Sequence, residues 1–459
     1  MKWTLKQLAA WCGTETKPEW ENIEISGVVS DSRKVEQGSL FVALRGENFD
    51  GHDFVESAMV CGAAAVLVEK PVKDSIPQIV VADTLKAYGQ MAAGYRSEME
   101  VKVVGVTGSV GKTTTKEMVA AILESKFRTA KTSGNHNNNL GLPMTVMDMP
   151  GDTEMAVLEM GMNHFGEMAY LASIAKPDIS VITNIGTSHI EYLGSREGIL
   201  EAKMEIMQGM DKKGVAVFNG DELLLWNLKD LEGHKKYYYG VENPMCDVVA
   251  ENVQQMDGGM SFRVKGMGQQ FSMFVPAEGI HTVYNALAAI TVGLICGVKA
   301  EKMQYQLAHF QNTGMRQQIL QENGMTIIAD CYNAGPESME AALTVLGDRE
   351  TSGRRIAVLG DMLELGTRSM AEHYRIGRLA VSKADIVYAY GTYSDRLITG
   401  AITGGMDKKN CIHFSTHEAM AKKLQAVAQP GDVLLFKGSR GMKMENVLKL
   451  FLGNTKEKA

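Results

Sequence analysis

A glycine-rich segment occupies residues 105–115, Gly-Val-Thr-Gly-Ser-Val-Gly-Lys-Thr-Thr-Thr, directly after the apolar run Val101–Val106. Glycines let the backbone curl around phosphate oxygens with its N–H groups turned inward, and a side chain at Gly108 or Gly111 would obstruct that approach. Lys112 supplies a charge for the β and γ phosphates, and Thr113 a hydroxyl for Mg²⁺. The segment predicts a nucleoside triphosphate site formed by Thr107, Gly108, Ser109, Val110, Gly111, Lys112, Thr113 and Thr114.

The first glycine of this segment departs from the usual phosphate-loop pattern. In G-x-x-x-x-G-K the opening glycine would stand at Val106, whereas here it stands one step earlier, at Gly105. The shift favours a variant class of phosphate loop over an ordinary one. A glycine-rich turn with an incidental lysine is the alternative.

Two residues that follow predicted strands are candidate metal ligands. Glu159 ends the apolar run Met155–Glu159, so its carboxylate should emerge at the edge of the sheet where the phosphate loop lies. Mg²⁺ prefers oxygen ligands from carboxylates, phosphates and water. His189 follows the run Ile179–Ile185, although a lone loop histidine is more often solvated than a ligand. For Glu159 the alternative is a surface glutamate at a strand end.

Lys203 lies in the helix-like run Arg196–Met210, on the same face as apolar residues. These residues are Ile199, Ile206, Met207 and Met210. Burial would lower the pKa of the lysine, and a neutral amine can capture CO₂ to form a carbamate, which is a carboxylate-like metal ligand. The alternative, which the residues alone favour, is a lysine that reaches solvent or pairs with Glu201 or Glu205.

An asparagine-rich run, residues 133–143, is too polar for a buried strand. Four of the five residues from Asn135 to Asn139 are asparagines, whose amides donate and accept hydrogen bonds without net charge. The run predicts a loop that orders phosphate or sugar oxygens, and a turn-rich surface loop is the alternative.

Short apolar runs alternate with helical patterns along the whole chain, which predicts an α/β protein of three domains, 1–98, 99–312 and 313–459. The charged stretch 96–102 and the loop 312–315 mark the boundaries. Predicted strands of the first domain are 27–29, 39–43, 63–68 and 78–81, with helices at 54–61 and 85–95.

The second domain should contain a mostly parallel sheet that binds ligands at the carboxyl ends of its strands. Its predicted strands are 101–106, 155–159, 179–185 and 215–219. Polar strand-like runs between 236 and 278 predict an antiparallel edge or side sheet, followed by a helix over 282–296. Predicted strands of the third domain are 326–330, 355–359, 386–389 and 432–436.

Composition excludes several classes of protein. The chain has 459 residues, a net charge of −7 and an isoelectric point near 5.9, without the basic stripe of a nucleic-acid binder. Its longest apolar stretch, Ala286–Val298, is too short to cross a bilayer, and the first residues lack a signal-peptide pattern. The six scattered cysteines lack metal-ligand spacing. We therefore expect a cytoplasmic protein without membrane insertion or nucleic-acid partners.

The order of these motifs resembles the Mur ligases, the ATP-dependent amide-forming enzymes of peptidoglycan synthesis, over nearly the whole chain. The resemblance accounts for the displaced glycine. It implies a metal site of Thr113, Glu159, His189 and carbamylated Lys203 (N6-carboxylysine), with Lys112, Glu159, His189 and Lys203 catalytic. It also implies further ATP contacts from Asn139, Asn285, Arg316 and Asp330, and a Rossmann-like third domain that binds the amino substrate.

Finer features are similar to one branch of the family. The N-terminal motifs resemble a UDP-binding domain, which implies substrate contacts from Ser30, Asp31, Ser32, Arg33, Phe41, Asp50, His52 and Asn135. Segments 330–336, 358–366 and 437–445 are similar to the ligases that add D-alanyl-D-alanine to UDP-N-acetylmuramoyl-tripeptide, which implies amino-substrate contacts from Asn333, Ser439 and Arg440. Gly335 departs from that pattern, where a second asparagine is common.

The resemblance implies a monomeric ligase that uses ATP and Mg²⁺ to make an acyl phosphate, which the dipeptide amine attacks when the third domain closes over the second. A diamino-acid-adding Mur ligase and folylpolyglutamate synthetase are alternatives, as is a non-catalytic ATP sensor. Residues 1–98 argue against the folylpolyglutamate enzyme, which lacks a counterpart to them. The sequence leaves open whether the third residue of the tripeptide is diaminopimelate or lysine.

Overall fold

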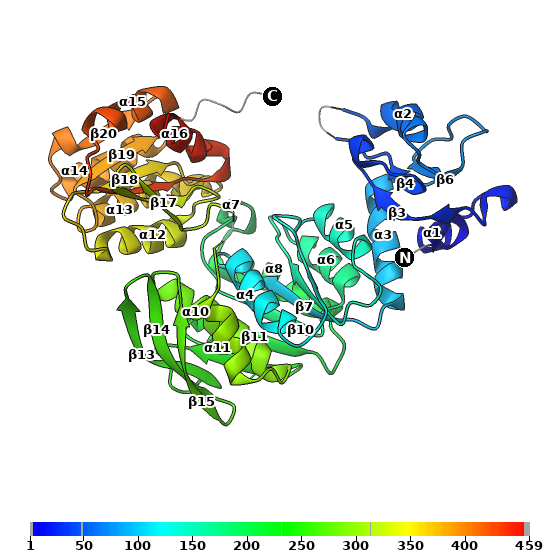
Figure 1. Ribbon diagram of the computed structural model, residues 1–459, viewed down its shortest axis with the longest axis horizontal. Coiled ribbons are helices and arrows are strands. Elements are labelled where there is room, and N and C mark those ends of the chain that lie inside the picture. Colours follow the sequence, from blue (N-terminus) through cyan, green and yellow to red (C-terminus); the bar gives the residue numbers. More distant parts are fainter. Residues whose placement is uncertain (1–2, 47–48, 231, 313, 454–459) are drawn as a thin grey trace.

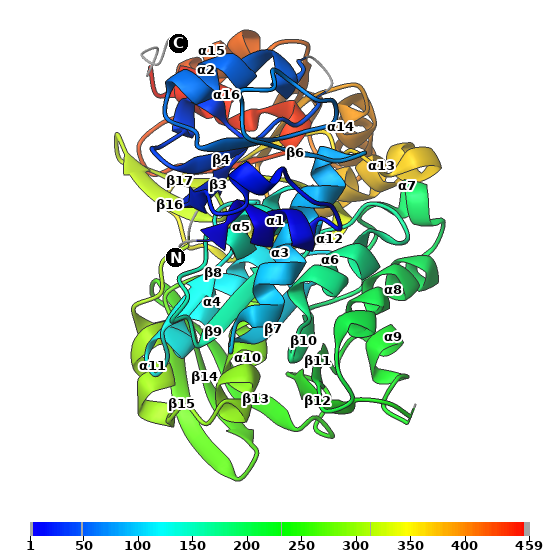
Figure 2. The same ribbon diagram turned by 90° about the vertical axis from the view of Figure 1, so that its right-hand side faces the viewer.

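The computed structural model describes residues 3–46, 49–230, 232–312 and 314–453. Three α/β units follow one another along the molecule, from the blue N-terminal unit through the cyan and green centre to the yellow and red C-terminal unit (Figure 1). Seen from the side, the C-terminal unit lies behind the N-terminal one, and both lie above the central unit (Figure 2). The predicted fold class is confirmed.

The N-terminal unit contains a four-stranded parallel sheet in the order β3-β4-β5-β6. The strands are β3 (Gly27–Val29), β4 (Ser39–Val42), β5 (Ala65–Val68) and β6 (Gln78–Val80), as predicted apart from their ends. A short antiparallel pair, β1 (Trp3–Thr4) and β2 (Glu24–Ile25), was not predicted. The helices are α1 (Leu5–Trp11), α2 (Val55–Val60) and α3 (Thr84–Glu98), and the Asp83 carboxylate caps α3 by accepting from Lys86 N.

Packing continues from α3 into the central unit. One hydrophobic cluster joins Trp3, Tyr88 and Tyr95 of the N-terminal unit to Val103 and Leu158 of the central sheet. Arg96, in the charged stretch proposed as a boundary, is buried and donates through Nε to Ala175 O at 3.0 Å. The N-terminal unit is therefore packed against the central unit through a shared hydrophobic cluster.

The central unit is built on a nine-stranded sheet in the order β15-β14-β13-β12-β11-β10-β7-β9-β8. Its strands are β7 (Lys102–Thr107), β8 (Thr129–Lys131), β9 (Met155–Glu159), β10 (Ile179–Ile182), β11 (Val215–Asn219), β12 (Lys235–Gly240), β13 (Val248–Met256), β14 (Gly259–Gly266) and β15 (Gln269–Val275). Pairing is parallel from β8 to β13 and antiparallel from β13 to β15. The segment predicted to be antiparallel is therefore an edge of the same sheet, but its first strand, β12, pairs in parallel on both sides.

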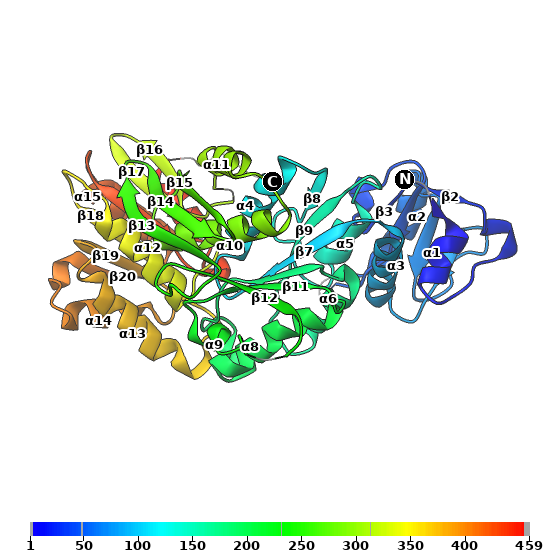
Figure 3. The same ribbon diagram turned by 90° about the horizontal axis from the view of Figure 1, so that it is seen from below.

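Helices cover both faces of this sheet, as the continuous apolar strands require (Figure 3). On one face α4 (Lys112–Glu124), α10 (Ile280–Ile295) and α11 (Ala300–Ala308) pack on Val104, Val106 and Val181. On the other face lie α5 (Gly141–Met147), α6 (Glu167–Ala175), α8 (Arg196–Met204) and α9 (Leu223–Trp226), against residues such as Leu158 and Phe218.

The C-terminal unit is a six-stranded sheet in the order β16-β17-β21-β18-β19-β20. Its strands are β16 (Gln318–Glu322), β17 (Met325–Asp330), β18 (Arg355–Gly360), β19 (Ile386–Tyr390), β20 (Cys411–Phe414) and β21 (Val433–Lys437). Helices α12 (Pro336–Asp348), α13 (Ser369–Ala380) and α14 (Ser394–Thr403) cover one face, and α15 (His417–Val427) and α16 (Met444–Phe451) the other. The four predicted strands are confirmed, whereas the edge strands β16 and β20 were missed.

The chain enters the C-terminal unit through residues with unusual backbone angles. Gly314, Met315 and Gln317 all have positive φ, of 69°, 53° and 51°, a region that only glycine adopts without cost. Thr313, within the predicted hinge, lies outside the described residues. Among the described residues, no helix is long and apolar enough to cross a membrane.

Candidate active site

The phosphate loop connects the end of β7 to the first residue of α4. Gly111 has a φ of 83°, and a Cβ there would lie 2.5 Å from Asn285 Oδ1, while a Cβ on Gly108 would collide with Thr183 Oγ1. Both glycines are therefore required by close neighbours as well as by the expected phosphates. The N-terminus of α4 points its free N–H groups at the loop, which suits an anion.

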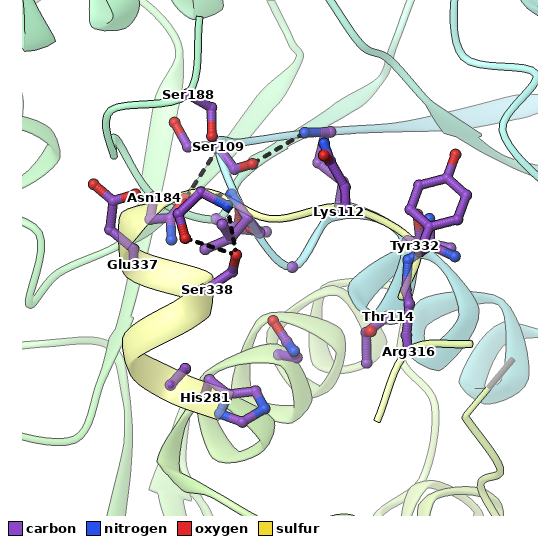
Figure 4. A pocket seen from close by; sticks show the side chains of 18 of the residues that line it. Ser109, Lys112, Thr114, Asn184, Ser188, His281, Arg316, Tyr332, Glu337 and Ser338 are labelled. Atoms are coloured by element: carbon purple, nitrogen blue, oxygen red, sulfur yellow. Dashed lines mark hydrogen bonds between the residues drawn. The ribbon is translucent and has the colours of Figure 1, made fainter. Parts of the chain in front are cut away.

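Lys112 folds back over this loop. Its ammonium donates to Gly108 O at 2.7 Å and to Ser109 O at 3.3 Å. Figure 4 shows Lys112 and Ser109 side by side. Burial lowers the pKa of Lys112, against the opposing effect of the Glu159 carboxylate. The charge is thus held within the curve of the loop, where phosphate oxygens are expected.

Asn184, which no sequence pattern indicated as a site residue, holds the loop in place from just beyond the end of β10. Its Oδ1 accepts from both Ser109 N and Val110 N at 3.0 Å. Thr183 Oγ1 donates to Val110 O at 2.6 Å, and Gly186 N donates to Ser109 Oγ at 2.9 Å. The predicted strand 179–185 therefore ends early, at Ile182, because the following residues turn to hold the phosphate loop.

Glu159 is nearly inaccessible, with 2% of its surface exposed, and both carboxylate oxygens are engaged. Thr113 Oγ1 donates to Oε2 at 2.7 Å, and Asn137 Nδ2 donates to Oε1 at 2.8 Å. Hydroxyl and carboxylate oxygens side by side fit a Mg²⁺ ion that takes its other ligands from phosphate and water. The described residues contain no cluster of three or more His, Cys, Asp or Glu side chains that could hold a metal by themselves.

The two remaining predicted metal-site residues lie apart from that pair. His189, with a φ of 65°, places Nδ1 2.6 Å from Glu364 Oε2 of the C-terminal unit. Hydrogen bonding to His189 holds the pKa of Glu364 below its usual range. That His189 and Lys203 join Thr113 and Glu159 around a metal stays a prediction.

Lys203 is buried, with 2% of its surface exposed, which agrees with its place on the apolar stripe and not with the alternative of a lysine that reaches solvent. Burial, and secondarily the charge of Lys112, hold its pKa well below the usual value. Glu205, a partner in the alternative interpretation, instead accepts hydrogen bonds from Gly166 N and Ala169 N. An uncharged amine at this position is what carbamate formation requires.

The C-terminal unit contributes charged groups to the same cavity, whose volume is about 670 Å³. The Arg316 guanidinium stacks on the Tyr332 ring at 3.7 Å. Lys437 Nζ lies 2.5 Å from Asp330 Oδ2 and also donates to Asn333 O. The structure brings many predicted residues together around this cavity, and Figure 4 shows Lys112 and Arg316 among them. The predicted residues that line it include Lys112, Thr113, Glu159, His189, Asn285, Arg316, Asp330 and Asn333, and Lys437, which was not predicted, lines it too.

Several predicted residues lie outside this cavity or contact only protein. Asn135 and Asn139 are exposed, and within their loop it is Asn137 that reaches Glu159. Ser439 is buried and bonds Leu363 N and Ala334 O, while Arg440 pairs with Glu445 at 2.8 Å. Their contacts with an amino substrate stay predictions.

The predicted UDP contacts other than Asn135 lie in the N-terminal unit, where Ser30, Asp31 and Ser32 are half-buried and Arg33 is exposed. Arg33 pairs with Asp31 at 2.9 Å, and His52 Nδ1 lies 2.5 Å from Asp50 Oδ1 while its Nε2 accepts from Glu69 N. Phe41 is 1% exposed and packs in the core of the small sheet. A ligand would therefore meet the backbone rather than the ring of Phe41.

Comparison with known proteins identifies the family. Residues 24–96, 106–293 and 315–440 match the descriptions Mur ligase family, catalytic domain; Mur ligase middle domain; and Mur ligase, glutamate ligase domain. The chain is 43% identical to the UDP-N-acetylmuramoyl-tripeptide–D-alanyl-D-alanine ligase of Bacillus subtilis, over 98% of each chain. The chain belongs to the Mur ligase family.

Solved structures of this family agree over the whole fold. A crystal structure of MurF from Acinetobacter baumannii is 33% identical, covers 99% of both chains and superposes with a TM-score of 0.91. The MurF ligase of Thermotoga maritima in complex with ADP is 30% identical over 94% of this chain and 98% of its own, with a TM-score of 0.83. The variant phosphate loop is thus that of a Mur ligase.

Proposed function

We propose that this protein is the ATP-dependent ligase that adds D-alanyl-D-alanine to UDP-N-acetylmuramoyl-tripeptide, giving the UDP-linked pentapeptide of peptidoglycan synthesis. The observation that carries this proposal is one cavity shared by the phosphate loop, the Thr113–Glu159 pair and the charged groups of the C-terminal unit. The near full-length similarity to curated ligases of that name supports the choice of substrates.

Activation of the carboxylate comes first, because a carboxylate is a poor electrophile. A tripeptide carboxylate oxygen attacks the γ phosphorus of ATP, the bond to the β-phosphate oxygen breaks, and ADP leaves. Lys112 neutralises charge on the transferred group, and the loop braced by Asn184 fixes its position. The chain's task in this step is positioning and charge stabilisation.

Thr113 and Glu159 would hold Mg²⁺, which screens the negative charge that gathers between the phosphates and the carboxylate. Lys203, as a carbamate formed from its amine and CO₂ with loss of a proton, and His189 would complete the metal-binding side chains. The lowered pKa of Lys203 supports this assignment, because only a neutral amine forms a carbamate.

Amide formation follows on the acyl phosphate. The dipeptide amine attacks the carbonyl carbon, and the tetrahedral intermediate expels phosphate while the amine loses its proton. Asn333, Ser439 and Arg440 are proposed to receive the dipeptide, and Arg316 and Asp330 the nucleotide, because they come from the unit that closes the cavity. We place the reaction in the cytoplasm, where ATP and UDP-linked precursors occur, and propose a monomer.

Purified protein incubated with ATP, Mg²⁺, UDP-muramoyl peptides and D-alanyl-D-alanine tests the proposal. We expect a pentapeptide product by mass spectrometry and ADP release that depends on both the tripeptide and the dipeptide. ADP released equally fast without an amino acceptor would reject the ligase and favour an ATP sensor. Product formed only from a shorter UDP-peptide and a free diamino acid would identify the alternative Mur-type activity.

A further inference from the structure

A second cavity of about 480 Å³ lies between the start of α3 in the N-terminal unit and the loops before α5 and α6 in the central unit. Asp83, Leu85 and Lys86 line it from one side, and Asn139, Phe165 and Tyr170 from the other. Helices α3, α5 and α6 run side by side here (Figure 1). The cavity is therefore formed by both units.

This second cavity adjoins the catalytic one. Four residues line both cavities, namely Asn138, Gly161, Asn163 and Glu167. A UDP-peptide would be bound by the N-terminal unit at one end and would have its reacting carboxylate at the phosphate loop. It must therefore extend past these four shared residues. The residue that carries the reacting carboxylate would then project its side chain toward the second cavity.

The charges around the cavity are of both signs. Lys86 is exposed, and its ammonium has no ion pair or hydrogen bond among the described residues. Asp83 uses one carboxylate oxygen to cap α3, accepting from Lys86 N at 2.9 Å. Glu167 accepts from Asn163 N through Oε2 at 2.8 Å, and its Oε1 lies 3.2 Å from His164 Nδ1, so each oxygen has one partner and a further lone pair. One unpaired cation thus lies beside two carboxylates that retain free acceptor capacity.

The walls between these charges are partly apolar. The Phe165 ring is 48% exposed and Leu85 is half-buried, so both offer surface to a chain of methylenes. A ligand that suits the cavity has an aliphatic stem and an end group bearing both an anion and a cation.

We propose that this cavity receives the side chain of the third peptide residue and selects diaminopimelate over lysine, with Lys86 binding the distal carboxylate and Asp83 and Glu167 the distal ammonium. This inference rests on the proposed function. A lysine side chain brings only an ammonium, which leaves Lys86 unpaired and places two like charges close together. The distal end of diaminopimelate carries both a carboxylate and an ammonium, so it can pair with Lys86 and with the two carboxylates.

The test compares two UDP-tripeptides that differ only in the third residue. For the wild type we expect kcat/KM to favour the diaminopimelate peptide by about tenfold or more, as one charge-assisted pair predicts. Lys86→Met should bring that ratio close to one, mainly through the KM for the diaminopimelate peptide. Lys212→Met, which removes an exposed lysine remote from both cavities, should leave the ratio unchanged.

Asp83→Asn gives a second, independent readout, because asparagine keeps the helix cap but loses the charge. It should weaken binding of both peptides about equally, measured by calorimetry without ATP, since both carry the distal ammonium. A wild type that prefers the lysine peptide, or a ratio that Lys86→Met does not change, overturns the inference while the ligase function stands. Failure to ligate either peptide rejects the proposed function itself.

Discussion

Lys112 is already folded over its own loop, with its ammonium against Gly108 O and Ser109 O. Replacement by methionine keeps most of the apolar volume but removes the charge from the position where the transferred phosphoryl group is expected. We expect Lys112→Met to lower kcat by about 10² to 10³, the cost typical of losing one charge-stabilising group. Initial rates of ADP release under saturating substrates measure this effect.

The matched control is Lys102→Met, because Lys102 is an exposed lysine at the start of β7, the strand that leads into the phosphate loop. It should keep the wild-type rate. The affinity of Lys112→Met for the UDP-tripeptide, measured by calorimetry, should equal that of the wild type. Ligation at wild-type speed without the Lys112 ammonium would contradict the mechanism.

For Lys203 we predict that the activity of the enzyme depends on CO₂. Burial, and secondarily the charge of Lys112, lower the pKa of the Lys203 amine, which favours the uncharged form that can combine with CO₂ to give a carbamate. Carefully degassed enzyme should lose most of its activity, and bicarbonate should restore it. Lys203→Ala should be inactive and insensitive to bicarbonate. Activity that is independent of CO₂ would leave Lys203 a structural residue.

Helix α4 joins the phosphate loop to the asparagine-rich loop through Lys116, which is completely buried. Its ammonium donates to Thr132 O at 2.7 Å, and Thr132 Oγ1 accepts from Glu159 N at 3.0 Å. Lys116→Met leaves that carbonyl unpaired, and we expect a loss of about 1–3 kcal/mol in the free energy of unfolding. Chemical denaturation measures it.

Lys212→Met, which changes an exposed lysine without a side-chain hydrogen bond or ion pair among the described residues, serves as the control and should cost less than about 0.5 kcal/mol. Because Thr132 also positions the Glu159 backbone, Lys116→Met should raise the Mg²⁺ concentration needed for half-maximal rate. An unchanged stability with normal Mg²⁺ dependence would show that the Lys116 contacts contribute nothing.

Elements with continuous apolar runs could be predicted from the sequence. Strands β9 (Met155–Glu159) and β11 (Val215–Asn219) have the predicted bounds because buried parallel strands are apolar throughout. Strand β13 lies within the segment 236–278 that was predicted to be strand-like, but its own bounds were not predicted, because its second half is polar and exposed. The run 196–210 is helical only to Met204, and continues as a short 3₁₀ turn, Glu205–Gly209.

The candidate site likewise contains residues that a local sequence pattern reveals and residues that it does not. Lys112 and Glu159 stand next to recognisable glycine and strand patterns, so sequence alone singles them out. Asn184 and Asn137 act through neighbours that only the strand order supplies, since β10 and β9 both pair with β7. A polar residue whose partner is distant in the chain carries no local pattern.

Across the whole molecule, a few polar contacts join the C-terminal unit to the central one. Thr187 Oγ1 donates to Glu337 Oε1 at 2.9 Å, and His189 lies 2.6 Å from Glu364. Arg349 pairs with Glu278 at 3.0 Å. Such partly exposed contacts contribute about 0.2–1 kcal/mol each, so the observed arrangement can be shifted by removing two of them.

Glu337→Ala combined with Glu364→Ala should therefore open the molecule. Both carboxylates contact the loop that carries His189, and their joint loss of roughly 0.4–2 kcal/mol would change the ratio of closed to open molecules by about two- to thirtyfold. Small-angle scattering of the nucleotide-free protein should give a larger radius of gyration, which ATP and Mg²⁺ partly reverse. Glu340→Ala is the control, because Glu340 lies on the same helix but pairs with Arg375 within its own unit. If the double variant and the control scatter alike, these contacts do not hold the two units together.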